Sequence, residues 1–165
     1  QNGFAKSLLE IMRIWIGTAI FEELFFRGLL QNMLAQQIHK SGTWKSYWTY
    51  GIAIMLILSA LASYALAIEY IWFPILITIG LFVPAYFLEQ KQYQAVGTYT
   101  ALAIISMAFG LAHYHKGSIL FVGLAAVAGW AYGYTYLKTK NVFYAALVHA
   151  CVNFSEFLFQ LHDIK

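Results

Sequence analysis

The chain has 165 residues, of which 61% are hydrophobic and 10% are charged, with a formal net charge of +3. Soluble domains are usually about 25% charged, so this composition excludes an ordinary water-soluble protein and favours a helical membrane protein. The small net charge gives no reason to expect a nucleic-acid partner, and the single cysteine, Cys151, excludes an internal disulfide.

The first predicted helix runs from Ala5 to Gln37. At 1.5 Å per residue it would be roughly 50 Å long, which exceeds the roughly 30 Å hydrocarbon core of a bilayer. Apolar residues at helical spacing, including Leu30 and Leu34, alternate with glutamines near its end. We therefore expect the last turns to leave the membrane as an amphipathic segment, followed by a polar loop from His39 to Lys45.

Five further apolar stretches follow, each with about the length of a membrane span. They run from Tyr50 to Ile68, Ile71 to Leu88, Thr98 to His113, Ile119 to Leu137 and Val142 to Phe159. The sequence thus predicts an all-α, polytopic membrane helix bundle of about six helices. Because the chain begins with Gln1 rather than Met, we leave open further helices ahead of the first one.

The fifth predicted span carries small residues at four-residue spacing, namely Ala125, Gly129 and Gly133. Such a face lets another helix approach closely, so these positions are predicted to pack helices together. Tyr132 and Tyr136 in the same span are interpreted as packing residues, and Glu89 as a loop charge.

Lysines are unequally distributed between the two ends of the predicted spans. One end carries Lys40, Lys45, Lys91, Lys138 and Lys140, whereas the other carries Lys6, Lys116 and Lys165. Cytoplasmic loops of membrane proteins collect lysine and arginine, so the first set of loops is predicted to be cytoplasmic.

Several polar residues interrupt the predicted spans. They are Glu22, Glu23, Arg27, His113, His149 and Asn153. A charged side chain at bilayer depth costs about 2.5 kcal/mol or more, which makes each a functional-site hypothesis. Glu23 and Arg27 are four residues apart on one helix face and can pair. Glu22 lies about 100° round the helix from Glu23 and is free to face another group.

The depths of four of these residues can be compared by counting from the lysine-rich end at 1.5 Å per residue. Glu22 and Asn153 lie about 18 Å deep, His149 about 12 Å and His113 about 24 Å. Four polar residues from three helices are therefore expected to converge near the middle of the bilayer.

This set of side chains favours hydrolysis of an amide. A buried glutamate is a suitable general base for water, with a histidine to share the proton. A second histidine and an amide on one helix face can donate hydrogen bonds to a developing oxyanion. Glu22, His113 and His149 could alternatively bind zinc, although the His-Glu-x-x-His signature is absent. Buried glutamates and histidines also serve transporters and proton relays, and a non-catalytic membrane protein of the immunity type is a further alternative.

Three motifs in chain order carry a family resemblance. Glu22-Glu23-x-x-x-Arg27, Phe109-x-x-x-His113 and His149-x-x-x-Asn153 resemble the motif series of the CPBP intramembrane proteases. That family includes the Rce1-type CAAX prenyl endopeptidases and the bacterial Abi proteins. The resemblance covers about Ile14 to Phe159.

The resemblance implies a glutamate-dependent membrane endopeptidase that needs no metal cofactor. Glu22 would activate water with His113, and His149 with Asn153 would form the oxyanion site. Glu23, Arg27 and Phe109 would support that site.

The resemblance also implies one protease domain over residues 1–165, in which the helical pair at about residues 50–88 is an insert. It implies a multi-pass protein of a bacterial plasma membrane. The expected substrate is a peptide or a membrane-anchored protein within the lipid bilayer, and a prenylated CAAX peptide is one option. No oligomeric state follows from it.

Overall fold

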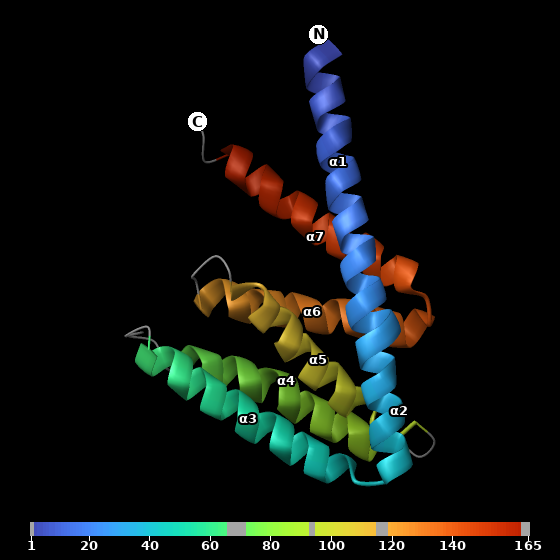
Figure 1. Ribbon diagram of the computed structural model, residues 1–165, viewed down its shortest axis with the longest axis vertical. Helices are drawn as coiled ribbons and strands as arrows, with labels where there is room; N and C mark the ends of the chain where they lie inside the picture. Colours follow the sequence, from blue (N-terminus) through green and yellow to red (C-terminus); the bar gives the residue numbers. More distant parts are fainter. Residues whose placement is uncertain (1, 66–71, 93–94, 115–118, 163–165) are drawn as a thin grey trace.

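The computed structural model describes residues 2–65, 72–92, 95–114 and 119–162, and this part of the chain contains helices and short turns but no strand (Figure 1). The helices are α1 (Asn2–Glu23), η1 (Leu24–Gln31), α2 (Asn32–Ser41), α3 (Trp44–Ala65), α4 (Trp72–Gln90), α5 (Thr98–Ala112), α6 (Ile119–Thr139) and α7 (Val142–His162). Because α1, η1 and α2 follow one another without a break, they form one continuous helical rod over residues 2–41, called the first rod below. With α3 to α7, the described residues thus form six helical rods. The predicted all-α bundle of about six helices is confirmed.

The first rod crosses the other helices steeply, and the start of α1 projects beyond them (Figure 1). Helix α5 is central, since it contacts α2, α3, α4, α6 and η1. Helix α7 packs against α1 and α6, so it closes the bundle on the side of the first rod. The three motifs therefore lie on helices that contact one another directly or through α6.

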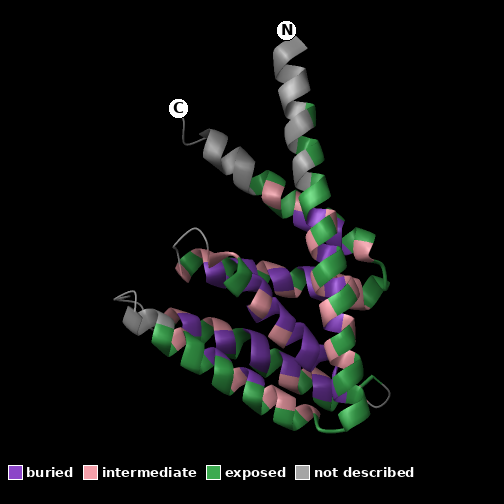
Figure 2. Cartoon of the chain, viewed as in Figure 1, coloured by how far each residue is buried: buried purple, intermediate pink, exposed green. Residues whose placement is uncertain are grey.

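Large apolar side chains cover the outer surface of the described helices. Phe21 is 73% exposed, and Leu61 and Phe143 are 60% and 61% exposed, whereas the buried residues lie between the helices (Figure 2). An apolar exterior of this extent is uncommon on a soluble monomer and is suited to contact with lipid. Within the described ranges, α4 and α6 are long and apolar enough to cross a membrane, and Thr98–Ala112 and Val142–Ser155 are shorter apolar helices. The six predicted spans remain a prediction.

The first rod differs from the single α-helix predicted from Ala5 to Gln37. Its hydrogen-bonding pattern widens to a π-helix over Leu24–Gln31, and the rod continues to Ser41. Extended π-helix is rare and occurs often at functional sites. The rod ends at Gly42, whose φ of 64° is left-handed and whose N–H donates to the carbonyl oxygens of Ile38 and His39. The predicted loop from His39 to Lys45 is consequently too long, because α3 already begins at Trp44.

The other predicted helices agree with the structure within a few residues, except that α3 starts six residues before the predicted Tyr50. Helix α4 ends at Gln90 rather than Leu88, α6 at Thr139 rather than Leu137, and α7 at His162 rather than Phe159. The predicted end of the second span, Ile68, lies outside the described residues.

Glu89 is not a loop charge, as the sequence suggested, but a buried residue of α4 that is 1% exposed. Its Oε1 accepts a hydrogen bond from the Gly97 N–H at 2.8 Å. Its Oε2 accepts from the N–H and the hydroxyl of Thr100 at 2.7 and 2.9 Å. The first N–H groups of a helix lack partners within it, so this carboxylate caps α5. It thereby fixes the start of α5, and His113 directly follows the last residue of that helix.

The helix ends that carry most of the lysines lie on one side of the molecule. The end of α2, the start of α3, the ends of α4 and α6 and the start of α7 all lie towards the right in Figure 1. These ends carry or adjoin Lys40, Lys45, Lys91, Lys138 and Lys140. That this side is cytoplasmic remains a prediction.

Candidate active site

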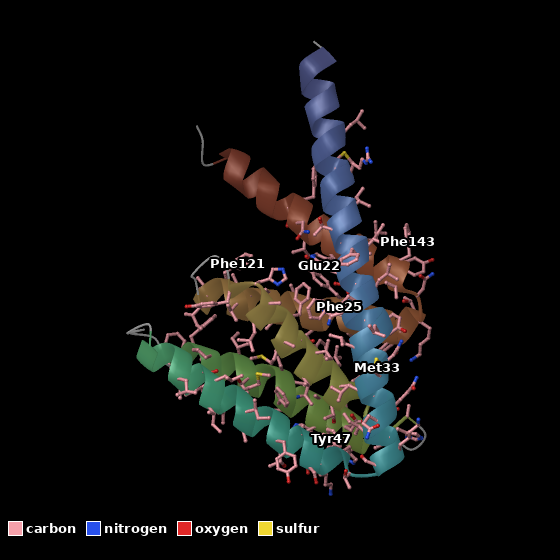
Figure 3. The ribbon with its side chains drawn as sticks, viewed as in Figure 1. Glu22, Phe25, Met33, Tyr47, Phe121 and Phe143 are labelled. Atoms are coloured by element: carbon pink, nitrogen blue, oxygen red, sulfur yellow. The ribbon has the colours of Figure 1, made fainter. Side chains whose placement is uncertain are left out.

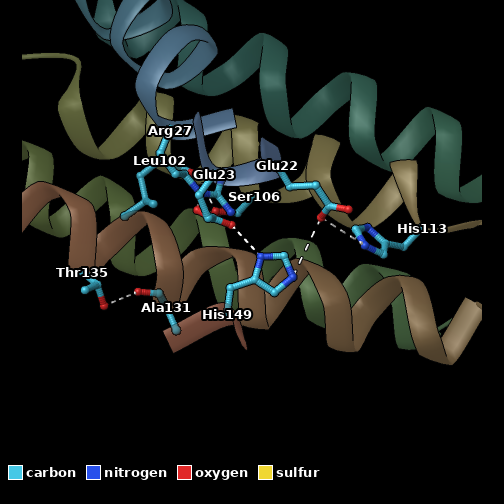
Figure 4. Close-up of polar contacts among 9 residues, drawn as sticks. All are labelled: Glu22, Glu23, Arg27, Leu102, Ser106, His113, Ala131, Thr135 and His149. Atoms are coloured by element: carbon cyan, nitrogen blue, oxygen red, sulfur yellow. Dashed lines mark hydrogen bonds and ion pairs between the residues drawn. The ribbon is translucent and has the colours of Figure 1, made fainter. Parts of the chain in front are cut away.

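Glu22, His113 and His149 come from three different helices and meet at one point. Glu22 is the penultimate residue of α1, His113 directly follows α5, and His149 lies within α7. The Oε2 atom of Glu22 is 3.8 Å from Nε2 of His113 and 3.8 Å from Nε2 of His149 (Figure 4). Figure 3 shows Glu22 where α1 passes α7. The structure thus brings together three of the four residues that were expected to converge.

His149 is held from its other ring nitrogen by Glu23. The Nδ1 atom of His149 is 3.1 Å from Oε1 of Glu23, while Oε2 of Glu23 accepts a hydrogen bond from Nε of Arg27 at 3.0 Å. The side chains of Glu23 and Arg27 are fully buried, and that of His149 is 5% exposed. A carboxylate only accepts hydrogen bonds, so these partners assign a proton to Nδ1 of His149.

His113 is oriented by the end of its own helix. Its Nδ1 atom is 2.8 Å from the carbonyl oxygen of Phe109, one turn earlier. The last carbonyl groups of a helix lack N–H partners, and a carbonyl can only accept, so Nδ1 of His113 donates here. With the proton of the neutral ring on Nδ1, Nε2 can act only as an acceptor, and it faces Glu22 (Figure 4).

Three acceptor atoms consequently face one another when both rings are neutral. The Oε2 atom of Glu22 is buried without a hydrogen-bond partner among the described residues. A distance of 3.8 Å is longer than the roughly 2.7–3.2 Å of a direct N–H···O bond. This arrangement favours a group that donates one hydrogen bond to Glu22 and another to a histidine, and water is the simplest such group.

Phe109 lies at the centre of the aromatic contacts around the site. The centroid of its ring is 4.5 Å from that of His113 and 5.6 Å from that of His149. The Cζ atom of Arg27 is 5.1 Å from the same ring, a cation–π distance. Phe109 therefore contacts one side chain from each of the three motifs, namely Arg27, His113 and His149.

The small residues of α6 make room for Arg27 and Phe109. Ala125, Gly129 and Gly133 are all buried. A Cβ atom on Gly129 would lie 2.9 Å from the Phe109 ring and 3.1 Å from Nη2 of Arg27. The small-residue face of α6 therefore packs against α5 and η1, and its close approach encloses the polar groups of the first motif.

Asn153 is not joined to this cluster. It lies one turn after His149 on α7, is partly buried, and makes no hydrogen bond with any described residue. Its predicted part in an oxyanion site remains a proposal. Ser106 donates to the carbonyl oxygen of Leu102 at 2.6 Å, and Cys151 is exposed. Neither is hydrogen-bonded to a histidine in the described part of the chain, so neither has the adjacent general base that activates a nucleophile.

Sequence reasoning missed one residue of the site, because it treated Tyr132 as a packing residue only. The Tyr132 ring lies parallel to the His149 imidazole, with centroids 4.5 Å apart and an interplanar angle of 14°. Its position three residues after Gly129 was the available signal, since residues three apart share a helix face.

The geometry of the candidate zinc ligands can be compared with that of a zinc site. Neighbouring ligands of a tetrahedral zinc, with bonds of about 2.0–2.1 Å, lie roughly 3.3–3.4 Å apart. The two Nε2–Oε2 distances here are 3.8 Å, and no three His, Cys, Asp or Glu side chains within the described ranges are arranged to hold a metal ion. Glu22, His113 and His149 would have to contract around zinc to bind it.

Comparison with known proteins adds family information. A family model described as type II CAAX prenyl endopeptidase Rce1-like matches residues 4–93 and 82–155. Together these segments contain all three motifs. No curated protein and no solved structure matches the chain.

Proposed function

The chain belongs to the type II CAAX prenyl endopeptidase Rce1-like family, and we propose that it is an intramembrane endopeptidase that uses Glu22 and His113 to activate water. Family membership implies a CAAX-type protease that acts on a membrane-associated peptide. The observation that carries the proposed mechanism is the position of Glu22 Oε2, 3.8 Å from Nε2 of both His113 and His149. A carboxylate beside two imidazoles suits proton transfer from water.

In the proposed reaction, Glu22 removes one proton from a water molecule while the water oxygen attacks the peptide carbonyl carbon. His113 accepts a hydrogen bond from the same water through Nε2 and keeps the attacking oxygen in place. The tetrahedral intermediate then expels the amine, which takes the proton from Glu22, and the products are a carboxylic acid and an amine. General-base catalysis of this kind contributes about 10²–10⁴-fold to the rate.

His149 stabilises the oxyanion in this proposal. Its Nδ1–H is held by Glu23, so a second proton on Nε2 makes an imidazolium that donates towards the substrate. The imidazolium and Arg27 then balance the charges of Glu22 and Glu23, which favours the arrangement in an apolar setting. Asn153, one turn further along α7, is the proposed second donor. Glu23, Arg27 and Phe109 orient these groups without contacting the substrate.

The proposed substrate carries an apolar anchor. A narrow apolar crevice of about 40 Å³ lies among α3, α4, α5 and α6, and its lining includes Met55, Phe73, Met107 and Leu111. Crevices with apolar walls bind apolar ligand groups. A prenylated CAAX-type peptide or a membrane-anchored protein fits this chemistry. The α3–α4 pair, which we propose to be an insert within one protease domain over residues 1–165, supplies part of the crevice wall.

The proposed setting is a bacterial plasma membrane, which the chain crosses several times with its lysine-rich ends in the cytoplasm. Positive loops on that side agree with the positive-inside rule. In this proposal the lipid bilayer surrounds the helices and also holds the substrate.

A peptide-cleavage assay tests the proposal. Purified protein in liposomes is given a prenylated CAAX peptide, the same peptide without its prenyl group, and an acylated peptide, and the products are identified by mass spectrometry. Glu22→Gln, which keeps the side-chain shape, is expected to lower kcat by about 10²-fold or more without changing the thermal unfolding temperature. Arg13→Gln, at an exposed position on the same helix, is the matched control.

Two results would contradict the proposal. Cleavage by Glu22→Gln at the rate of the control would remove Glu22 from the mechanism. Absence of cleavage of every peptide by folded wild-type protein would favour the alternatives of a transporter or a non-catalytic membrane protein.

A further inference from the structure

The imidazole of His149 is contacted by two buried aromatic rings. Tyr132 from α6 stacks on one face of it, with centroids 4.5 Å apart and planes 14° from parallel. Phe109 from α5 meets it edge to face, with centroids 5.6 Å apart at 80°. Tyr132 and Phe109 are each only 2% exposed. The plane of the His149 ring is therefore defined by its neighbours from two other helices.

We propose that Tyr132 is a positioning residue for His149: its ring holds the imidazole in the plane that directs Nδ1 to Glu23 and Nε2 towards Glu22. The consequence for turnover rests on the function proposed above. The orientation of the His149 ring does not depend on that function, and it can be measured separately.

Hydrogen bonding alone leaves the His149 ring incompletely oriented. Its contact with Glu23 at 3.1 Å is within reach of a hydrogen bond, whereas its contact with Glu22 at 3.8 Å is not. The χ2 torsion of histidine is broad, so one hydrogen bond at Nδ1 permits the ring to rock about that bond. Stacking on Tyr132 restrains this rocking motion, while Glu23 selects which nitrogen points inward. The two contacts are thus complementary.

Tyr132 is itself firmly placed. Its ring packs edge to face against Phe109, with centroids 5.9 Å apart at 88°. Gly129 and Gly133, on the same part of α6, permit the close approach of that helix to α5 and η1. A shift of α6 would therefore move the stacked ring relative to His149.

The stack should matter most when His149 carries positive charge. The face of an aromatic ring attracts a cation, so Tyr132 stabilises an imidazolium that donates to the oxyanion. An interaction that strengthens in the transition state affects kcat more than KM. This pattern separates a positioning role from a purely structural one.

Three variants of α6 test the proposal in the peptide-cleavage assay. Tyr132→Phe keeps the stacked ring and is expected to keep kcat near the wild-type value. Tyr132→Leu removes the ring and is expected to lower kcat by about 10²-fold with little change in KM, because small misplacements of a catalytic group cost about that much. Tyr134→Leu is the matched control, since Tyr134 stacks on Trp130 at 5.3 Å and 8° in the same helix without contacting His149.

A second measurement is independent of catalysis. In protein labelled with ¹⁵N and ¹³C histidine, the His149 signals are assigned from their loss in His149→Gln. Wild type, Tyr132→Phe and Tyr134→Leu should show a ring-current shift of the His149 carbon-bound protons and a protonated Nδ1. Tyr132→Leu removes the ring current of Tyr132 in any case, so the deciding signals are those of the nitrogens, which should be averaged.

Each outcome decides a separate point. Unchanged His149 nitrogen signals in Tyr132→Leu, or an unchanged kcat, would overturn the positioning role. An equal loss of kcat in Tyr132→Phe would assign the effect to the hydroxyl and also overturn it. An equal loss in Tyr134→Leu would reduce it to general destabilisation of α6. If wild type cleaves nothing, the proposed protease function fails, whereas the NMR comparison still decides whether Tyr132 orients His149.

Discussion

Glu23 and His149 are separated by 126 positions in the sequence and meet in a buried contact of 3.1 Å. The same carboxylate binds Arg27 through its other oxygen at 3.0 Å. One glutamate therefore joins the first motif to the third, and the ion pair of η1 is continuous with the orientation of a histidine on α7. Disturbing the pair should affect both stability and the site.

Arg27→Ala is expected to destabilise the protein by about 3–5 kcal/mol, because it leaves the carboxylate of Glu23 buried and without its charged partner. Thermal unfolding in detergent measures this loss. Arg13→Ala, which removes an exposed arginine from α1, provides the comparison. Equal unfolding temperatures for the two variants would mean that Glu23 does not depend on Arg27.

Gly129→Leu is expected to lower stability by about 1–3 kcal/mol and to reduce activity, since the added side chain would enter space held by Phe109 and Arg27. Gly80→Leu is the matched control, because a Cβ at Gly80 meets nothing within 4 Å. Both variants are compared by thermal unfolding and peptide cleavage. A Gly129→Leu protein that behaves like Gly80→Leu would show that α6 does not need its close approach to α5.

Glu89→Ala is expected to destabilise the protein by about 1–3 kcal/mol, because it removes the acceptor of hydrogen bonds from Gly97 and Thr100 at the start of α5. Gln90→Ala, at the exposed neighbouring position, should leave the unfolding temperature nearly unchanged. Hydrogen exchange of the first turn of α5 locates the effect. Equal protection of that turn in the two variants would argue against the cap.

Asn153→Ala is expected to lower kcat by about 10²–10³-fold while substrate still binds, as for the loss of one oxyanion donor. The measurement is peptide cleavage at several substrate concentrations, so that kcat and KM are obtained separately. Phe154→Ala, at the exposed next position, controls for a general disturbance of α7. A loss confined to KM would place Asn153 in substrate binding and not in the oxyanion site.

Peptide cleavage is expected to survive exhaustive chelation, because the proposed mechanism assigns water activation to Glu22 and His113 alone. The assay is repeated after dialysis against a chelator and again after addition of stoichiometric zinc. Loss of activity and its return with zinc would instead make Glu22, His113 and His149 metal ligands.

Local features of this protein could be predicted from its sequence. Composition and apolar run length indicated the all-α class and the approximate helix boundaries, because helix formation depends on neighbours within a few residues. The i,i+4 spacing of Glu23 and Arg27 indicated that they can pair, and the motif series indicated the family. The spacing of Ala125, Gly129 and Gly133 likewise marked a face suited to close packing.

Contacts between helices were decided by the tertiary structure. The π-helix at Leu24–Gln31, the capping of α5 by Glu89 and the stacking of Tyr132 on His149 have no local sequence signal strong enough to predict them. The capping and the stacking depend on the distance and crossing angle of consecutive helices, and these follow from the packing of many side chains at once. The meeting of Glu22 with two histidines at 3.8 Å is of the same kind: spacing along the chain supplied the candidates, and packing brought them together.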